Sequence, residues 1–283
     1  MILIAILFCL ALQRFAKMGG WFHASWFEGY LGLLNPWLSK LDERLIILLV
    51  IAPILLLFVL LHFIFAGWFF DLFDLILATT VLFFCIDARD LKYKLKPYFE
   101  AMEKSDMHSA SDAVADFISD VSIGNIADLS RAVTKAVFLK SFERVFVGLF
   151  WFVAFGIYGV ATYSLVVLLR QNALKVNPNY IELAKSAAKV QEILEWLPAR
   201  LLGFTYALVG HFNKGFNYDI KHLWSGLSEV KKFAVDSGLA ALDVSNNVSD
   251  ADKSENYAAL DIVNRVLIIW IMAVILIFLG LLL

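Results

Sequence analysis

The residue whose type and position are most informative for chemistry is Arg200. It lies two residues after Pro198 and leads directly into the apolar stretch 201–210. An unpaired charge beside lipid is costly in free energy, so we expect Arg200 to have an acidic or phosphate partner. The candidate acids are Glu143, Glu192 and Glu195. Two alternatives stay open: a structural ion pair, or a clamp that binds an anionic ligand through parallel N–H bonds.

Other ionisable residues lie in or beside apolar runs. His62 interrupts such a run, which makes it either a functional residue or a histidine hydrogen-bonded to a neighbouring helix. Asp71 and Asp74 are three residues apart at the outer rim of a hydrophobic run, and we interpret them as solvated carboxylates at a helix start. A basic run follows a hydrophobic segment and favours a topology signal that contacts anionic lipid head groups; its members are Arg89, Lys92, Lys94 and Lys96.

Several chemistries have no motif in this sequence. It has no glycine-rich phosphate loop, dinucleotide-binding fingerprint, CxxC, HExxH or nucleophile elbow. The 5 histidines show no metal-ligand spacing, and Cys9 and Cys85 lie in apolar runs. We therefore expect no metal and no cofactor. The net charge of −2 gives no general attraction to phosphate backbones, so nucleic acid is not an expected partner.

The elements that must position these residues are membrane helices. Hydrophobic residues make up 61% of the 283 residues and charged residues 18%, a composition that excludes a soluble globular enzyme. About 20 apolar residues are needed to cross the hydrocarbon core. The candidate runs are Leu45–Phe65, Phe69–Ile86, Val145–Leu169 and Val266–Leu283, with Met1–Leu12 as a short anchor. The sequence predicts an all-α, polytopic integral membrane protein with helical cytoplasmic segments and the lipid bilayer as a partner.

The distribution of charge divides the chain into five segments. Lysine and arginine favour the cytoplasmic side, which places the charged helical segment 87–144 inside. The polar stretch Ser245–Asn256 is interpreted as a mobile linker. The predicted segments are an N-terminal anchor and hairpin (1–86), a cytoplasmic helical segment (87–144), membrane-embedded helices (145–211), an amphipathic helix with the linker (212–263), and a C-terminal span (264–283).

The run Val145–Leu169 has two open interpretations. A plain crossing would place the basic residues of 170–196 outside, against the positive-inside rule. The glycines at 148, 156 and 159 would instead allow the run to bend back as a re-entrant hairpin. The hairpin is the interpretation that agrees with the charges.

The sequence also resembles a known family. The string WLPARLLGFTYALVGH at Trp196–His211 is similar to the AmpE family of bacterial inner-membrane proteins, which is linked to β-lactamase induction. The likeness extends to FERVFVGLFWF at Phe142–Phe152 and LSRAV at Leu129–Val133. More distantly, the chain resembles the cobinamide-phosphate synthases, membrane enzymes of cobalamin assembly.

The resemblance implies two alternative functions. The first is a signalling or accessory protein of the inner membrane, whose partner would be a protein of cell-wall recycling. The second is a membrane enzyme or binding protein that acts on an anionic, phosphorylated or lipid-linked ligand. The polar positions that match the synthases would form one charged pocket on the cytoplasmic side; these positions are Asp120, Arg131, Glu143, Glu192 and Arg200.

Three departures weaken the enzymatic interpretation. Gln191 stands where the synthases have the first aspartate of a pair, and Leu139 and Lys140 replace an upstream glutamate and asparagine. A carboxylate cluster able to hold Mg²⁺ is therefore depleted, so the resemblance favours a non-catalytic protein and leaves the catalytic residues unassigned.

Overall fold

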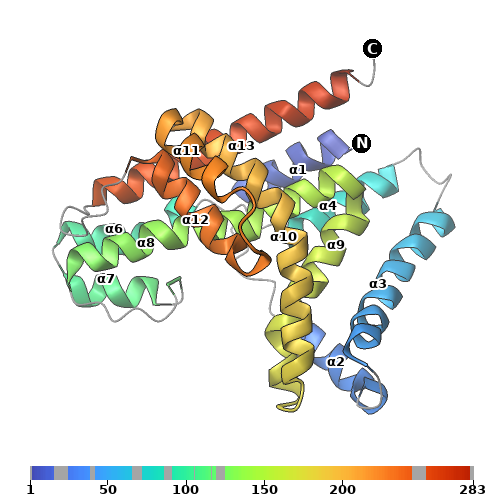
Figure 1. Cartoon of the computed structure of the whole chain (residues 1–283). Coiled ribbons are helices and arrows are strands. Elements are labelled where there is room, and N and C mark those ends of the chain that lie inside the picture. The colour runs from blue at the N-terminus through green and yellow to red at the C-terminus, as the bar shows by residue number, and fades with distance from the viewer. Residues whose placement is uncertain are drawn as a thin grey trace. The chain divides into compact units, whose positions relative to one another are not determined.

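The architecture is helical throughout the residues that the computed structural model describes. These are 2–15, 25–38, 42–65, 72–85, 91–104, 106–115, 117–118, 125–243 and 253–280. Every regular element in these ranges is a helix, which confirms the predicted class (Figure 1). The runs long and apolar enough to cross a membrane are Glu43–Ile64, Ile126–Val176 and Ser254–Ile277. The chain is a multi-pass membrane protein, and the bilayer is its partner.

The helices fall into two compact units. Unit 1 comprises Met1–Asp87 and Val147–Glu195, and unit 2 comprises Ala88–Phe146 and Trp196–Leu283. The helices of unit 1 are α1 (Ile2–Phe15), α2 (Ser25–Leu38), α3 (Glu43–Phe65), α4 (Leu72–Cys85), α9 (Val147–Val176) and the first part of α10 (Ile181–Val209). Unit 2 contains the rest of α10 and the helices α5 (Leu91–Lys94), α6 (Lys96–Glu103), α7 (Met107–Val114), α8 (Ile126–Ser141), the π-helix η1 (Phe142–Phe146), α11 (Phe212–His222), η2 (Leu227–Glu229), α12 (Val230–Ala241) and α13 (Lys253–Gly280).

Unit 1 has an apolar core shared by α2, α3, α9 and α10. Phe27 and Val50 are fully buried there, together with Leu169 and Ala187. The other side of α3 is also apolar but exposed, as expected for a helix that faces lipid. Within unit 1, His62 of α3 lies 2.9 Å from Asp74 of α4, so this histidine pairs with the neighbouring helix. Asp71 lies outside the described residues.

The run Val145–Leu169 is broken by a sharp bend at Gly156. Its backbone has φ 62° and ψ −145°, a conformation that side chains with a Cβ rarely adopt. Three residues later the chain passes so close to itself that a Cβ on Gly159 would lie 2.4 Å from the carbonyl oxygen of Trp151. The indole of Trp151 donates a hydrogen bond of 3.0 Å to the carbonyl of Leu194, which fixes the bend against α10. The bend is therefore at one of the three glycines that the sequence offers.

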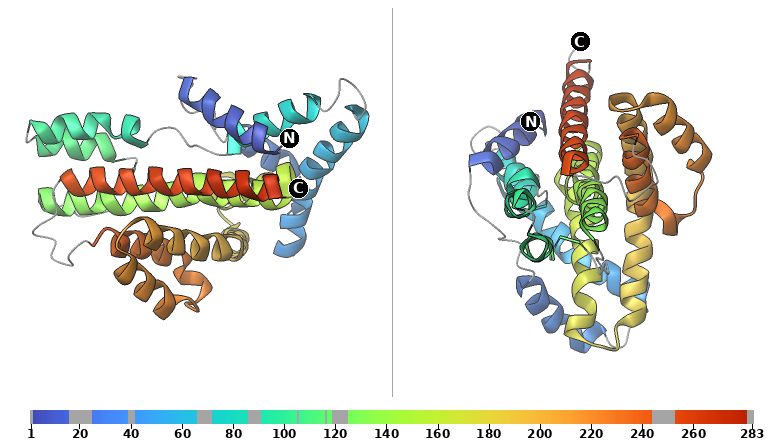
Figure 2. Two further views of the ribbon diagram at one scale, coloured as in Figure 1. Left: turned by 90° about the horizontal axis from the view of Figure 1, so that it is seen from above. Right: turned by 90° about the vertical axis from the view of Figure 1, so that its left-hand side faces the viewer.

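Unit 2 is organised around α8. This helix begins as the sequence predicts, because the Asn125 side chain accepts a hydrogen bond of 2.8 Å from the Asp128 backbone N–H. α13 runs beside α8 (Figure 2). α12 also packs on α8, and a Cβ on Gly238 would lie 2.6 Å from the ring of Phe138, so the absence of a side chain at Gly238 permits this approach. The helix α8 thus contacts a different helix on each of two sides.

The predicted linker is wrong for its last four residues. α13 begins at Lys253, earlier than the predicted span at 264, and residues 253–256 belong to it. Asn256 is fully buried and takes part in four hydrogen bonds, which stabilise this first turn despite its polar composition. Residues 244–252 of the predicted linker lie outside the described residues.

Candidate functional site

Arg200 is buried in unit 2, where it clamps a turn. Its side chain is 3% exposed, and its guanidinium carbon lies 4.2 Å from the centre of the Phe233 ring. The Nε atom donates a hydrogen bond of 3.0 Å to the carbonyl of Leu223. The Nη2 atom donates to both the carbonyl and the hydroxyl of Ser225, at 3.0 and 2.8 Å. The arginine therefore connects α10 to the turn between α11 and α12.

The acidic group that interacts electrostatically with Arg200 is Asp219 of α11. Its carboxylate is fully buried and accepts a hydrogen bond of 2.6 Å from the hydroxyl of Ser237. Burial raises the pKa of the Asp219 carboxyl to about 6, although Ser237 and Arg200 both favour its charged form. The neighbouring Tyr218 donates to Asp236, and burial followed by this carboxylate raises the pKa of its phenol. At neutral pH the cluster holds a buried cation and a mostly ionised buried anion.

Two buried atoms of this cluster have unused hydrogen-bonding capacity. Among the described residues, neither Nη1 of Arg200 nor Oδ2 of Asp219 has a hydrogen-bond partner. The α10 backbone approaches closely here, since a Cβ on Gly203 would lie 2.9 Å from Oδ1 of Asp219. The cluster therefore holds α10, α11 and α12 together while leaving hydrogen-bonding capacity unused at these two atoms.

A second polar network in unit 2 joins α13 to α8. The Asn256 amide donates to the Ser130 carbonyl and to the Thr134 hydroxyl, both at 2.8 Å. Its oxygen accepts from the hydroxyls of Tyr98 and Ser130 at 2.9 and 3.1 Å. Arg131 adds an ion pair of 3.1 Å to Glu255. This network fixes the start of the C-terminal helix to one side of α8.

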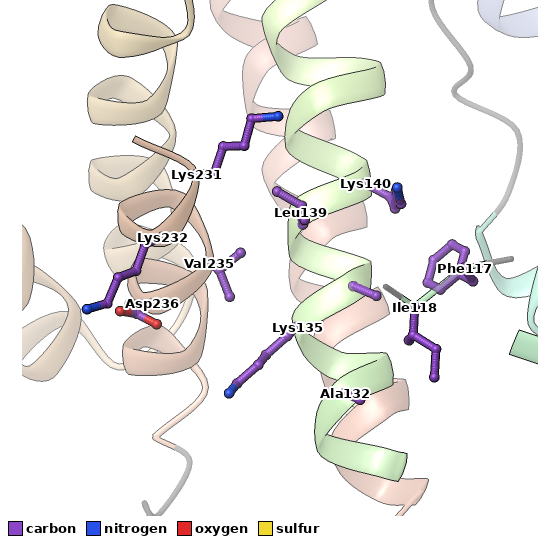
Figure 3. A pocket seen from close by; sticks show the side chains of 11 residues that line it. Phe117, Ile118, Ala132, Lys135, Leu139, Lys140, Lys231, Lys232, Val235 and Asp236 are labelled. Carbon is purple, nitrogen blue, oxygen red and sulfur yellow. The ribbon is translucent and has the colours of Figure 1, made fainter. Parts of the chain in front are cut away.

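A groove lies between α8 and α12, with a volume of about 420 Å³. Its cationic side chains are Lys135, Lys140, Lys231 and Lys232. In Figure 3, Lys135 and Leu139 face α12, while Phe117 and Ile118 lie on another side of α8. Lys231 forms an ion pair with Glu143, which positions that end of the groove. The groove combines a basic rim with an apolar lining.

The five residues of the predicted charged pocket have different surroundings. Arg131 pairs with Glu255, Glu143 with Lys231, and Arg200 with the turn that follows α11. Glu192 is half-buried in the part of α10 that belongs to unit 1, and Asp120 lies outside the described residues. A single pocket formed by all five therefore stays a prediction.

The position that departs from the synthases, Gln191, belongs to a buried network in unit 1. Its side-chain oxygen accepts a hydrogen bond of 2.9 Å from Arg170, and its amide donates one of 2.5 Å to Glu195. Glu195 is fully buried and also accepts from the hydroxyl of Tyr163 at 2.9 Å. Glu195 is thus held in unit 1 by neutral donors. Over the ranges that the structure describes, no three His, Cys, Asp or Glu residues form a group that could hold a metal ion.

Sequence reasoning missed two groups of polar residues. Asp219 and Ser237 carry no motif, and only the packing of α11 on α12 brings them to Arg200. The groove lysines lie in two segments about a hundred residues apart, so no local spacing connects them. One feature of the sequence could have indicated a binding site for an anion: Lys231 and Lys232 are adjacent at the start of a helix. Cations at this end interact unfavourably with the helix dipole, so a pair of them there is unusual.

Comparison with protein families gives a match over almost the whole chain. The model described as "Regulatory signalling modulator protein AmpE" matches residues 1–282. A protein from Shigella flexneri named "Protein AmpE" is 25% identical over 136 residues, which is 46% of this chain and 48% of that protein. No solved structure matches the chain.

Two curated relatives carry the name "Cobalamin biosynthesis protein CobD". The one from Chromobacterium violaceum is 29% identical over 184 residues, covering 64% of this chain and 56% of the relative. The one from Stutzerimonas stutzeri is 31% identical over 131 residues, covering 46% and 43% respectively. The chain spans about half the length of the curated relatives it matches.

Proposed function

Since this chain belongs to the AmpE family of regulatory signalling modulators, we propose that it regulates a response to cell-wall stress, such as β-lactamase induction, from the bacterial inner membrane. In this proposal the chain binds an anionic ligand at a charged surface of unit 2 on the cytoplasmic side. It passes the binding event to its C-terminal span and to a protein partner of cell-wall recycling. The family match and the likeness to a named AmpE protein support this proposal.

The observation that carries the proposal is the double role of α8. One side of α8 holds α13 through Ser130, Arg131 and Thr134. Another side lines the basic groove through Lys135 and Leu139. A ligand that binds better to one arrangement of α8 and α13 shifts the population toward that arrangement. Because α13 is also a candidate span, such a shift reaches the membrane.

The proposed orientation has its own test. In a variant without the natural cysteines, we expect Lys96→Cys to be protected from an impermeant thiol reagent in intact cells and to react after permeabilisation. Lys96 is a suitable position because its side chain is 67% exposed. Labelling in intact cells would place segment 87–144 outside and contradict a cytoplasmic site.

The regulatory function is tested in the bacterium that encodes the chain. Deletion of the gene should change β-lactamase activity after a β-lactam challenge, and the wild-type chain should restore it. Asn256→Leu, which removes the four hydrogen bonds of Asn256 in the network between α13 and α8, should fail to restore it. Asn264→Leu on an exposed side of the same helix is the matched control, and immunoblots establish equal abundance in the membrane. Unaltered induction in the deletion strain would refute the proposal.

A second candidate function rests on the likeness to the two cobalamin biosynthesis proteins. In this alternative the chain is a membrane enzyme or binding protein that acts on an anionic or lipid-linked ligand. Mass spectrometry of molecules retained after purification in mild detergent distinguishes the two. A retained protein partner supports the regulator, and a retained phosphorylated metabolite that the purified chain converts supports the enzyme.

A further inference from the structure

We propose that the groove between α8 and α12 is a binding site for a phosphate-bearing amphiphile, a molecule in which a phosphate is joined to an apolar chain. This inference deepens the proposed function, on which it rests for its biological meaning, because it names the class of ligand. The charge, the lining and the position of the groove support the binding site independently of that function.

The charge of the groove favours an anion. Four lysines line it, and the acids at the same place are Asp236 and Glu143, which leaves an excess of two positive charges at neutral pH. Glu143 is engaged by Lys231 and Asp236 accepts from Tyr218. Lysine ammonium groups recognise phosphate as point charges, without the fixed fork of arginine. In Figure 3, Lys135 and Lys231 extend beside the space between the two helices, whereas Lys140 and Lys232 extend outward from α8 and α12, so the lysines form a basic rim that attracts a phosphate and do not enclose it.

The lining favours an amphiphile over a bare phosphate. Between the lysines the groove is lined by Ala132, Ala136, Leu139 and Val235, with Phe117 and Ile118 beyond α8 (Figure 3). An inorganic anion would leave this apolar surface in contact with water. An apolar chain attached to the phosphate would cover it and gain free energy from its burial. The volume of about 420 Å³ is within the range of about 300–1,000 Å³ of small-molecule sites.

The position of the groove favours a ligand that reaches it from the membrane surface. Lys140 lies five residues before Val145, where the uncharged run begins, a rise of about 7 Å along a helix. Lys231 is fixed still nearer to that run by its ion pair with Glu143. The basic end of the groove is therefore at the depth of lipid head groups, where a phosphate can bind while its chain lies along the apolar lining.

The test uses the full-length chain in a non-ionic detergent and geranyl phosphate as the probe, measured by calorimetry. Geraniol lacks the phosphate and inorganic phosphate lacks the chain, so both should bind at least about tenfold more weakly. The double variant Lys135→Gln and Lys232→Gln should lose about tenfold in affinity, as expected for two exposed ion pairs. The matched control, Lys185→Gln with Lys189→Gln, removes the same charge from an exposed side of α10 and should bind as wild type.

Two further arms distinguish the source of the ligand. In nanodiscs, the first arm compares how much phosphatidylglycerol and how much phosphatidylcholine the chain retains. A preference for phosphatidylglycerol that is smaller in the Lys135/Lys232 variant than in wild type would identify a membrane lipid as the ligand. Binding of geranyl phosphate without such retention would identify a soluble phosphorylated amphiphile. Equal affinity of the groove variant and the wild type, or equal binding of geraniol and geranyl phosphate, would overturn the site. A variant that loses the probe but keeps normal β-lactamase induction would instead refute the proposed function and leave the site intact.

Discussion

Replacement of Arg200 tests whether this side chain holds α10 to the turn that follows α11. Arg200→Ala removes three hydrogen bonds, to the carbonyl of Leu223 and to the carbonyl and hydroxyl of Ser225. It also removes the ring contact with Phe233 and the positive charge near Asp219. The turn is partly exposed, so water can replace some of the lost donors, whereas the buried carboxylate has no such compensation. We expect a loss of about 3 kcal/mol in the stability of unit 2.

Arg200→Lys separates charge from geometry. An ammonium keeps the positive charge but cannot donate to Leu223 and Ser225 in the fixed directions of the guanidinium. The expected loss is about 1–2 kcal/mol, roughly half that of alanine. Asp219→Asn introduced into Arg200→Ala should recover about 1 kcal/mol, because it removes the buried charge that alanine leaves uncompensated.

The assay must report on unit 2 alone, since a chain with two compact units need not unfold in one step. Protease cleavage in the turn 223–226, followed as a function of urea in mild detergent, gives the opening free energy of this region. An opening free energy for Arg200→Ala within about 0.5 kcal/mol of wild type would refute the clamp, because three lost bonds from a charged donor would then have had no effect.

Three further predictions concern other residues. Asn256→Ala should lower the stability of the contact between α13 and α8 by about 3 kcal/mol, because it removes the four hydrogen bonds that the Asn256 side chain makes to buried groups, while Asn264→Ala should be neutral; hydrogen exchange of the α13 backbone amides measures both. The pKa of the Asp219 carboxyl is about 6 in the folded chain against 3.8 in the unfolded chain, so the folded state binds its proton more readily. The contribution of Asp219 to stability therefore falls as the pH rises from about 4 to 6. Unfolding midpoints measured across this pH range should fall in this way in wild type, and Asp219→Asn should remove this part of the pH dependence. Gly156→Ala should destabilise unit 1 by about 1–3 kcal/mol, because the positive φ of Gly156 is unfavourable for a residue with a Cβ, and should lower the thermal unfolding midpoint. The control Gly29→Ala has open space around its Cβ and should not lower this midpoint.

Local features of the sequence were predictable because their causes are local. The Asn125 cap depends on a side chain and a backbone N–H three residues away, and both are visible in the sequence. Three of the four predicted runs overlap candidate spans that meet the length and composition of a crossing, whereas in the run Phe69–Ile86 the described helix α4 (Leu72–Cys85) is too short to be one of them. The polar stretch before α13 shows the weakness of composition, because a mobile linker and the first turn of a helix are both polar. What distinguishes them here is the burial of Asn256 against α8, which is a tertiary contact.

The candidate sites were less predictable because they depend on packing between distant segments. The sequence indicated that Arg200 needs a partner but favoured glutamates near it, whereas its bonds go to carbonyl groups of a later turn and its countercharge is Asp219. Backbone carbonyls are present at every residue, so their use leaves no trace in residue types. The basic groove forms only when α12 packs on α8, and nothing local to Lys135 or Lys231 indicates that they share it.

The bend at Gly156 changes how crossings of the membrane are counted. A hydropathy profile treats the uncharged residues 145–169 as one straight rod and counts one crossing. With the bend, the run consists of arms of about 11 and 13 residues, roughly 17 and 20 Å long, each shorter than the hydrocarbon core of about 30 Å. A run that enters and leaves through the same face adds an even number to the count. Compared with a single straight crossing, a run of this kind would place every later segment on the opposite side of the membrane. The backbone angles of one glycine would therefore decide on which side of the membrane the later segments lie.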